Sequence, residues 1–323
     1  MTEDTYPRLV GDVGGTNARF AWLAAPDQPL AEIDTLPAAS HASLIDAIRH
    51  YLAEHGKPSP RWCAIGIANP VGGDLVKMTN HHWSFSISQL QREVGAQRLL
   101  VINDFTALAL ALPSLRGAER RQVGGGEAVA DEVLGLLGPG TGLGVSGLVP
   151  ATGRHGAIPI DGEGGHVTLA AANEREDRVV AALRRRFGHA SAERALSGPG
   201  IVNLYQALCE LAGETPAAWD AADITQRAMS AGDPRCVEAV DLFFSFLGAV
   251  AGNLALSLGA RGGVYIGGGI VPRLGEAIDR SRFRERFEDK GRFRDYLASI
   301  PTWVVQAKDS PALLGAARAL DEL

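Results

Sequence analysis

Two glycine-rich turns, each leading from one apolar segment straight back into another, constrain this sequence more than any other feature. The first lies in LVGDVGGTNARFAW at 9–22, and the second joins VLGLLGPG to LGVSGLVP at 133–150. Apolar runs on both sides of the glycines indicate β-hairpins. In a doubly wound dinucleotide-binding fold, the glycine turn leads into a helix instead. The sequence therefore argues against that fold and predicts two strand–turn–strand units.

The first hairpin opens a series of predicted elements. Strands at 8–12, 18–24 and 32–36 are followed by a helix for which Ser40 is the expected N-cap and which Gly56 ends. Next come a strand in WCAIGIANP, a helix in SISQLQREVG, a strand in RLLVIND and a helix in FTALALALPSL. The order is β-β-β-α-β-α.

The second hairpin opens a similar series. The extended stretch GAIPI, the helix NEREDRVVAALRRRFG and the strands GGVYIGGG and TWVVQA follow it. The chain closes with a helix in DSPALLGAARAL, for which Asp309 or Ser310 is the expected cap. Two parts with the same order predict an internal duplication of an α/β unit.

Composition limits the function classes. The 323 residues are 46% hydrophobic and 21% charged, as in an ordinary globular protein of two domains or one large α/β unit. The net charge of -6 disfavours a nucleic-acid partner. Three well-separated cysteines and the absence of an apolar leader favour a cytoplasmic location. The apolar segment 242–260 is long enough to span a membrane, but a buried helix is favoured and no membrane partner is expected.

The first glycine turn combines an acid with small polar residues. Gly14 and Gly15 let backbone N–H groups approach a phosphate, and Thr16 or Asn17 can add hydrogen bonds. Asp12 can hold a hydrated Mg²⁺ ion. The alternative is a hairpin whose glycines serve only the turn.

The second turn lacks the acid. GPGTGLG does not match the G-x-G-x-x-G fingerprint, and the chain has no P-loop motif. Gly140, Thr141 and Gly142 can instead pair with the first turn and hold a polyphosphate. Gly268 and Gly269, before IVPR, offer a further close approach for the base or sugar of a nucleotide.

A strand that ends in an acid gives the sharpest catalytic candidate. In VINDFTA, Asn103 and Asp104 stand where a strand meets a helix. Ligands of α/β sheets gather at the carboxyl ends of strands, so Asp104 can act as a general base and Asn103 can bind a hydroxyl group. The alternative is that Asp104 only caps the following helix.

Three further polar residues can bind hydroxyl groups. Glu163 and His166 stand three apart in DGEGGH, and Glu193 lies in SAERALSGPG. An acid and an imidazole together accept and donate hydrogen bonds to neighbouring hydroxyls. A polar turn for DGEGGH and a solvated or capping glutamate for Glu193 remain open. No further ligands stand at the spacing of a zinc site.

Together these motifs resemble those of the bacterial ATP-dependent glucokinases of the proteobacterial type. LVGDVGGTNARFA, MTNHHWSFS, INDFTALALALP, GPGTGLGV, DGEGGHV, SAERALSGPGIVNLY, GGVYIGGGIVPR and FEDKGRF occur in that family's order over residues 9 to about 315. The resemblance implies an actin-like ATPase fold of the ribonuclease H-like kind, a duplicated β-β-β-α-β-α fold in two domains with an interdomain cleft. We expect residues 1–114 plus 308–323 to form the small domain and residues 115–307 the large one.

The resemblance also implies roles for the candidate residues. In the family's matching motifs, Asp104 is the catalytic base, and the glucose hydroxyls are held by Asn103, Asp104, Glu163, His166 and Glu193. The two glycine turns would face the phosphates of ATP, with Asp12 positioning Mg²⁺ through water, and GGGIVP would face the adenosine. The implied reaction is ATP-dependent phosphorylation of D-glucose to glucose 6-phosphate by a homodimer.

Three alternatives stay open. The first is a kinase for another hexose, such as mannose, fructose or glucosamine. The second is a sugar-sensing regulator without turnover, and the third, disfavoured by the strand after each glycine turn, is a nicotinamide-dependent dehydrogenase. The segment after His166, VTLAAANEREDR, holds no cysteine, which separates the sequence from zinc-bearing sugar kinases and repressors of the ROK type.

Overall fold

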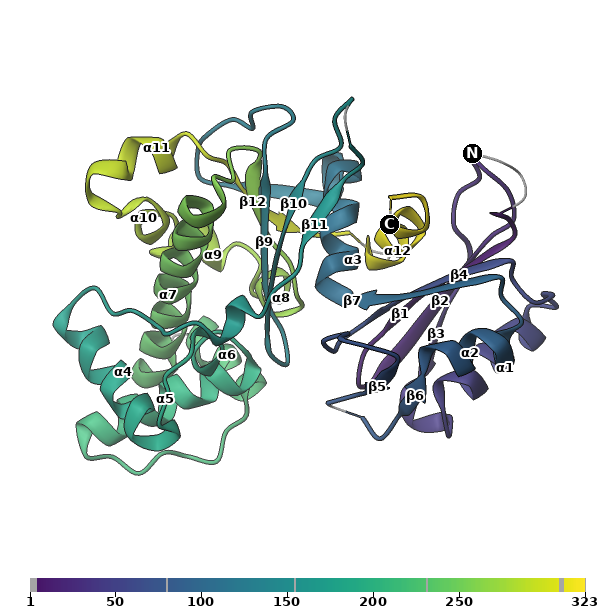
Figure 1. Ribbon diagram of the computed structural model, residues 1–323. Coiled ribbons are helices and arrows are strands. Elements are labelled where there is room, and N and C mark those ends of the chain that lie inside the picture. The colour runs from purple at the N-terminus through teal and green to yellow at the C-terminus, as the bar shows by residue number, and fades with distance from the viewer. Residues whose placement is uncertain (1–4, 80, 154, 231, 308–310, 323) are drawn as a thin grey trace. The chain divides into compact units, whose positions relative to one another are not determined.

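The fold is described from a computed structural model that covers residues 5–79, 81–153, 155–230, 232–307 and 311–322 (Figure 1). The caps predicted at Asp309 or Ser310 lie outside these residues. The strands are β1 (Arg8–Val13), β2 (Asn17–Leu23), β3 (Ala31–Pro37), β4 (Trp62–Ile67), β5 (Leu75–Lys77), β6 (Ser84–Ser86), β7 (Arg98–Asn103), β8 (Arg120–Val123), β9 (Leu134–Pro139), β10 (Leu143–Val149), β11 (Ile158–Ile160), β12 (Gly263–Ile266) and β13 (Thr302–Val305).

The α-helices are α1 (Leu44–Glu54), α2 (Ile87–Val94), α3 (Asp104–Ala111), α4 (Glu174–Phe187), α5 (Gly198–Ala212), α6 (Ala221–Met229), α7 (Pro234–Leu258), α8 (Ile270–Leu274), α9 (Ala277–Arg280), α10 (Phe283–Glu288), α11 (Arg294–Ala298) and α12 (Pro311–Glu322). Short 3-10 helices are η2 (Ala38–Ser40), η3 (Leu112–Ser114), η4 (Gly117–Glu119), η5 (Gly164–His166), η6 (Ala192–Arg194) and η7 (Gly291–Phe293).

Both predicted hairpins are present, and each begins a mixed sheet. The five-stranded sheet has the order β3-β2-β1-β4-β7, with β1 antiparallel to β2 and parallel to β4. The six-stranded sheet has the order β11-β10-β9-β12-β13-β8, with β9 antiparallel to β10 and parallel to β12. Apart from the outer strand β8, the two sheets share one strand order.

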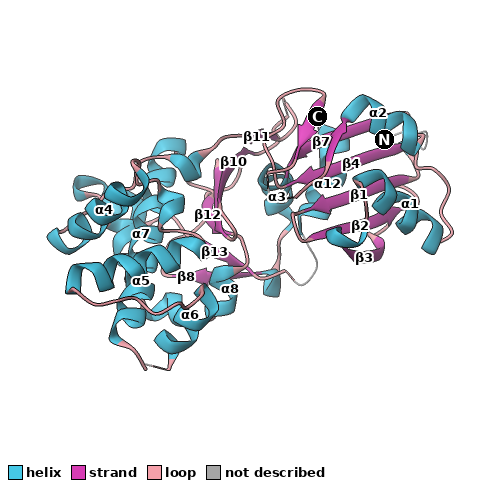
Figure 2. Ribbon diagram, turned by 90° about the horizontal axis from the view of Figure 1, so that it is seen from below, coloured by secondary structure: helices cyan, strands magenta, loops and turns pink. Residues whose placement is uncertain are grey.

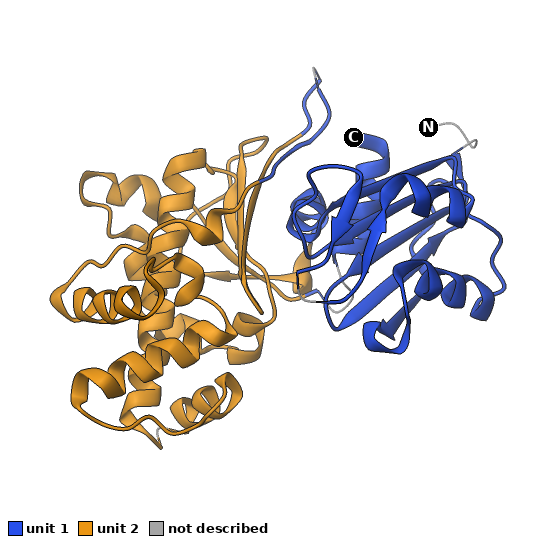
Figure 3. Cartoon of the chain, turned by 60° about the horizontal axis from the view of Figure 1, so that its bottom comes forward, with its two compact units in different colours: residues 1–115, 151–161, 307–323 blue, residues 116–150, 162–306 orange. Residues whose placement is uncertain are grey.

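The chain divides into two compact units (Figure 3). Unit 1 consists of residues 1–115, 151–161 and 307–323, and unit 2 of residues 116–150 and 162–306. The sequence placed the domain limits after 114 and 307, and it assigned the segment 151–161 to the larger domain. In the structure this segment is part of unit 1.

In unit 1, helices cover both faces of the five-stranded sheet (Figure 2). Alternate residues of β1 point to opposite faces, as the pleat requires. Leu9 joins the core beneath α1 and α2, whereas its neighbour Val10 packs against α12. Helix α12 also lies very close to α3, because a Cβ on Gly315 would stand 1.6 Å from the carbonyl oxygen of Ala107. A glycine is therefore required at that crossing.

The first helix begins later than the sequence predicted. Ser40 ends η2, and Ser43 is the N-cap of α1. The Ser43 hydroxyl accepts the N–H of Asp46 at 3.3 Å and donates to the Asp46 carboxylate at 2.7 Å. This reciprocal pair satisfies a backbone donor in the first turn, which is why Ser43 takes the capping position.

Three strands were not predicted from the sequence. The segments β5 and β6 form a separate two-stranded ribbon, and β8 pairs antiparallel with β13. Each is only three or four residues long. A run of that length is too short to show a period of two in the sequence, so its pairing depends on tertiary context.

The core of unit 2 gathers around the 25-residue helix α7. This helix is long and apolar enough to cross a membrane, but 78% of its most apolar 18-residue window is buried. The prediction of a buried helix is therefore confirmed. A Cβ on Gly248 would stand 2.1 Å from the carbonyl oxygen of Phe283, and one on Gly252 would stand 2.4 Å from that of Phe287. The two glycines thus let α10 pack directly on α7.

Candidate active site

In unit 1, the register of three parallel strands brings the predicted residues to one edge of the sheet. Val13 of β1 pairs with Ile67 of β4, which pairs with Asn103 of β7. The residues that follow these strands therefore leave the sheet side by side, as parallel strands do at their carboxyl ends. The structure brings the first glycine turn and the acid Asp104 to the same edge.

The first glycine turn has backbone donors at its tip. Gly14 donates its N–H to the carbonyl of Asn17 at 2.9 Å, and the carbonyl of Thr16 accepts the N–H of Ala38 at 2.8 Å. Among the residues that the structure describes, the N–H groups of Gly15 and Thr16 have no hydrogen-bond acceptor. Two such N–H groups side by side are suited to bind an anion.

Asp12 stands one residue before the end of β1. Its carboxylate faces Arg19 across the hairpin at 3.3 Å, and its side chain is 16% exposed. Within the described ranges, no three His, Cys, Asp or Glu side chains gather to hold a metal ion. A Mg²⁺ ion that also binds substrate phosphates needs only one or two protein carboxylates, so Asp12 fits that ion.

Asp104 is the first residue of α3, and its neighbour Asn103 is the N-cap. The Asn103 side-chain oxygen accepts the N–H groups of Phe105 at 2.9 Å and Thr106 at 3.3 Å. The N-cap is therefore Asn103 and not Asp104, although the Asp104 carboxylate also accepts the N–H of Phe105, at 3.0 Å. A Cβ on Gly66 would stand 3.2 Å from the Cβ of Ala107, a tight contact, so this glycine lets α3 pack close to the sheet.

The loop after β4 supports Asn103. Its amide nitrogen donates to the carbonyl of Asn69 at 3.4 Å. The Asn69 side chain is buried and accepts both the N–H and the hydroxyl of Thr79, at 3.0 and 2.8 Å. The sequence analysis did not single out Asn69 or Thr79, because nothing local shows that residues ten apart share hydrogen bonds.

The second glycine turn, in unit 2, is held by hydrogen bonds from residues that lie later in the chain. The Glu193 carboxylate accepts the N–H of Leu143 at 2.9 Å, and the N–H of Gly198 donates to the carbonyl of Gly140 at 2.9 Å. Within the turn, Gly140 donates to the carbonyl of Gly142 at 2.8 Å. Glu193 thus binds the backbone of the turn rather than acting as a capping-box glutamate.

Glu163 is the N-cap of the 3-10 helix η5, and His166 is the last residue of that helix. His166 Nε2 and Glu163 Oε2 are 3.9 Å apart, and each side chain is about 60% exposed. Gly165 between them packs closely on β10, because a Cβ there would stand 2.1 Å from the carbonyl oxygen of Leu143. The backbone of this loop is therefore fixed in place while both polar side chains remain accessible.

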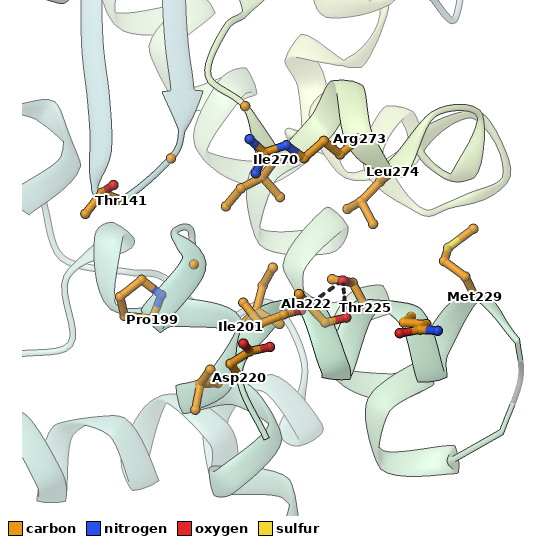
Figure 4. A pocket seen from close by; sticks show the side chains of 16 residues that line it. Thr141, Pro199, Ile201, Asp220, Ala222, Thr225, Met229, Ile270, Arg273 and Leu274 are labelled. Atoms are coloured by element: carbon orange, nitrogen blue, oxygen red, sulfur yellow. Dashed lines mark hydrogen bonds between the residues drawn. The ribbon is translucent and has the colours of Figure 1, made fainter. Parts of the chain in front are cut away.

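Unit 2 contains a cavity of about 880 Å³ beside the second glycine turn (Figure 4). Thr141 lies at one end and Met229 at the other, and Asp220 and Arg273 stand on opposite walls. Asp220 and Arg273 are the charged residues of the lining. The lining consists of Gly140, Thr141, Gly198, Pro199, Ile201, Val202, Asp220, Ala221, Ala222, Thr225, Gln226, Met229, Gly269, Ile270, Arg273 and Leu274.

Three of the predicted nucleotide residues, Gly140, Thr141 and Gly269, line this cavity. Gly268 does not line it. It has a φ of +74°, and a Cβ there would stand 2.3 Å from the carbonyl oxygen of Pro139. The α6 wall was not foreseen, because its sequence, AADITQRAM, carries no recognisable motif.

Comparisons with known proteins fit this arrangement. The glucokinase family profile matches residues 9–323. A glucokinase of Aromatoleum aromaticum is 59% identical over 319 residues, covering 98% of this chain and 96% of that protein. A glucokinase of Chromobacterium violaceum is 54% identical over 314 residues, covering 97% and 89%.

Solved structures of glucokinases have the same fold as this chain. A glucokinase from an Antarctic psychrotroph superposes with a TM-score of 0.89 at 36% identity, and each chain is covered completely. A ROK family glucokinase from Streptomyces griseus, solved with glucose and AMPPNP, shares the fold with a TM-score of 0.63 at 18% identity, covering 97% of this chain and 99% of that one.

The two-unit α/β fold, with a glycine hairpin at the start of each sheet, defines a sugar kinase. This chain belongs to the glucokinase family. The resemblance stated from the motifs is thereby confirmed, and so are the predictions of an enzyme and of glucose phosphorylation. The dehydrogenase alternative is wrong, since both glycine turns lead into strands.

Proposed function

We propose that Asp104 is the general base in the transfer of the γ-phosphoryl group of ATP to the 6-hydroxyl of glucose. The observation that carries this proposal is the position of Asp104 at the first residue after β7, on the sheet edge that also presents the first glycine turn. The hydroxyl proton passes to the Asp104 carboxylate while the O6–P bond forms. The bond from the γ-phosphorus to the bridging oxygen breaks, and ADP leaves with that electron pair.

The sugar is held by a second group of residues in this proposal. Asn103 binds a hydroxyl beside the base, and Glu163, His166 and Glu193 bind the others. The accessible side chains of Glu163 and His166 support this role, because an acid and an imidazole 3.9 Å apart can accept and donate to adjacent hydroxyls. The support of Asn103 by the Asn69 loop keeps its side chain in one orientation.

ATP is proposed to bind through both glycine turns and the cavity of unit 2. The cavity is long and mostly apolar, which suits a purine base, and Thr141 and Gly140 at one end suit the phosphates. Arg273 has no hydrogen-bonded or ion-paired partner among the described residues, so its guanidinium can face the nucleotide. Asp12 would hold Mg²⁺ through water. The bound ion would neutralise charge on the β- and γ-phosphates.

The finer fold assignment is also a proposal. We infer that the two units are copies of one β-β-β-α-β-α unit of the actin-like, ribonuclease H-like kind. The shared order of the two sheets supports this inference. A homodimer, which the family resemblance implies, is proposed as well and is tested by light scattering on the purified protein. The cytoplasmic location that the three separated cysteines favoured remains a proposal too.

The test is ADP production with MgATP against glucose, mannose, fructose and glucosamine, for the wild type beside Asp104→Asn. We expect glucose-dependent turnover and a kcat reduced by ~10²–10⁴ in the variant, since it lacks the proton acceptor. Asp46→Asn is the matched control, because Asp46 also lies in the first turn of a unit 1 helix. If only another hexose is turned over, the assigned substrate changes, but the role of Asp104 as the general base stands. Glucose binding without turnover by the wild type would contradict the proposal.

A further inference from the structure

We propose that Glu193 is a positioning residue for the phosphates of the nucleotide, in addition to its proposed contact with glucose. This inference rests on the proposed function, and it assigns the carboxylate a second task. Glu193 contacts the residue that follows the turn Gly140-Thr141-Gly142, and two residues of this turn, Gly140 and Thr141, line the cavity in which the nucleotide is proposed to bind.

One short segment, residues 193–198, fixes this turn at two points. The Glu193 carboxylate accepts the Leu143 N–H at 2.9 Å on one side, and the Gly198 N–H donates to the Gly140 carbonyl at 2.9 Å on the other. The segment itself is rigid, since the Ser197 hydroxyl donates to the Glu193 carbonyl and caps α5 by accepting from Gly200. Removal of the Glu193 carboxylate therefore removes one of the two attachments of this turn.

The contact occupies one N–H next to the turn and leaves two others available. With the Leu143 N–H taken by Glu193, the N–H groups of Thr141 and Gly142 have no acceptor among the residues in the described ranges. Two adjacent N–H groups without an acceptor are suited to bind an anion, and Thr141 lines the cavity. A carboxylate this close to the phosphates would repel them electrostatically. In this proposal the repulsion is outweighed because the carboxylate orders the N–H groups that bind the phosphates.

A side chain at residue 142 would force the Glu193 carboxylate to move from its present position. A Cβ on Gly142 would stand 2.5 Å from Glu193 Oε2, and its φ lies outside the left-handed region. Apart from the same glutamate's Cδ at 3.3 Å, the described structure has no other atom within 4 Å of that Cβ position. A Gly142→Ala substitution therefore tests the contact between Glu193 and the turn directly.

The experiment measures AMPPNP binding by calorimetry with Mg²⁺ and without any sugar, so that a lost sugar contact cannot contribute. We expect the Kd to rise ~10-fold or more in Glu193→Ala and less in Glu193→Gln, which keeps an acceptor oxygen for the Leu143 N–H. Glu210→Gln is the control, because Glu210 is an exposed glutamate on α5 that pairs with Arg185. Thermal unfolding of each variant checks that it folds.

Gly142→Ala completes the test as a double-mutant cycle. In the wild type we expect this change to raise the AMPPNP Kd ~10-fold, and in the Glu193→Ala background by less than about twofold, because the blocking oxygen is gone. Equal losses in both backgrounds, or unchanged or tighter AMPPNP binding by Glu193→Ala, would overturn the inference. Failure of the wild type to bind AMPPNP or to turn over glucose would instead count against the proposed function.

Discussion

The two glycine hairpins look alike in sequence, yet the molecule holds them in different ways. The first carries its own charged pair, Asp12 and Arg19, across the ladder. The corresponding pair in the second hairpin is Gly138 and Gly144, with no side chains at all. Its carboxylate comes instead from Glu193, fifty residues further along the chain. Similar turns can therefore depend on local residues in one unit and on tertiary contacts in the other.

The two hairpins also differ in how closely residues from other segments pack against them. Two glycine backbones press on the second hairpin, Gly165 on the carbonyl of Leu143 and Gly268 on that of Pro139. At Gly14 of the first hairpin, the nearest atom to an added Cβ is the Asn17 carbonyl oxygen at 3.6 Å, an ordinary contact. Neighbouring backbone thus encloses the strands of the second hairpin. The first hairpin is open at Gly14, and Gly11 below it meets side chains, those of Ile65 at 2.7 Å and Phe20 at 3.1 Å.

The largest expected effect is that of Gly165→Ala on stability. Because the new Cβ would stand 2.1 Å from a backbone carbonyl, we expect a loss of about 3 kcal/mol and a melting point lower by roughly 6–12 °C. Differential scanning calorimetry measures this change. A variant that melts with the wild type would show that the loop can move away from β10, and the contrast between the hairpins would then disappear.

Asp12→Asn tests the charged pair of the first hairpin. If Asp12 holds the hydrated ion, the variant should lose ~10–100-fold in kcat/KM for MgATP and require more Mg²⁺ for half-maximal rate. Steady-state rates at graded Mg²⁺ concentrations give both values. Arg19→Gln is the companion variant, since it removes the other half of the pair. If kcat/KM for MgATP falls equally in the two variants, the loss comes from breaking the Asp12–Arg19 ion pair. Asp12 would then not be needed to hold Mg²⁺.

Arg273→Gln tests the cavity that only the second hairpin borders. We expect the KM for ATP to rise ~10-fold, because a guanidinium contact to the nucleotide is lost, while the KM for glucose stays within about twofold. Initial rates with each substrate varied in turn separate the two constants. The exposed Arg280 on α9 serves as the control, as Arg280→Gln removes a charge from the same unit. A rise in the KM for glucose alone would place Arg273 outside the nucleotide site.

The smallest expected effect is that of Gly14→Ala on stability. The new methyl group meets only the Asn17 carbonyl oxygen at 3.6 Å, so the melting point should change by less than about 2 °C. The same calorimetry as for Gly165→Ala gives the comparison. A large loss would show that the first hairpin is as tightly constrained as the second.

Much of this architecture could be predicted from the sequence. Strong local patterns gave the two hairpins, the strand that ends at Asn103 and the buried helix α7, because apolar period and glycine turns act within a few residues. Ser43 could also have been found as the cap of α1, since Asp46 three residues later completes the capping pattern.

The remaining features depend on contacts between distant residues. The carboxylate of Glu193 meets Leu143 only after β10 and η6 have packed together, and Asn69 meets Thr79 only after the loop beyond β4 has folded. The α6 wall of the cavity is formed by alanines, Thr225, Gln226 and Met229, residue types that would suit any helix surface. Such features have no local signature, so the residue pattern alone does not reveal them.

The close packing of α10 on α7 has a consequence for synthesis. The face of α7 around Gly248 and Gly252 is covered by Phe283 and Phe287, which leave the ribosome after the helix itself. Translation proceeds at about 5–20 residues per second, so this face of α7 stays exposed on the nascent chain for about 2–6 s. During those seconds a segment with the composition of a membrane anchor is accessible to targeting factors and chaperones, so the speed of translation between the two helices becomes part of how this enzyme reaches its native state.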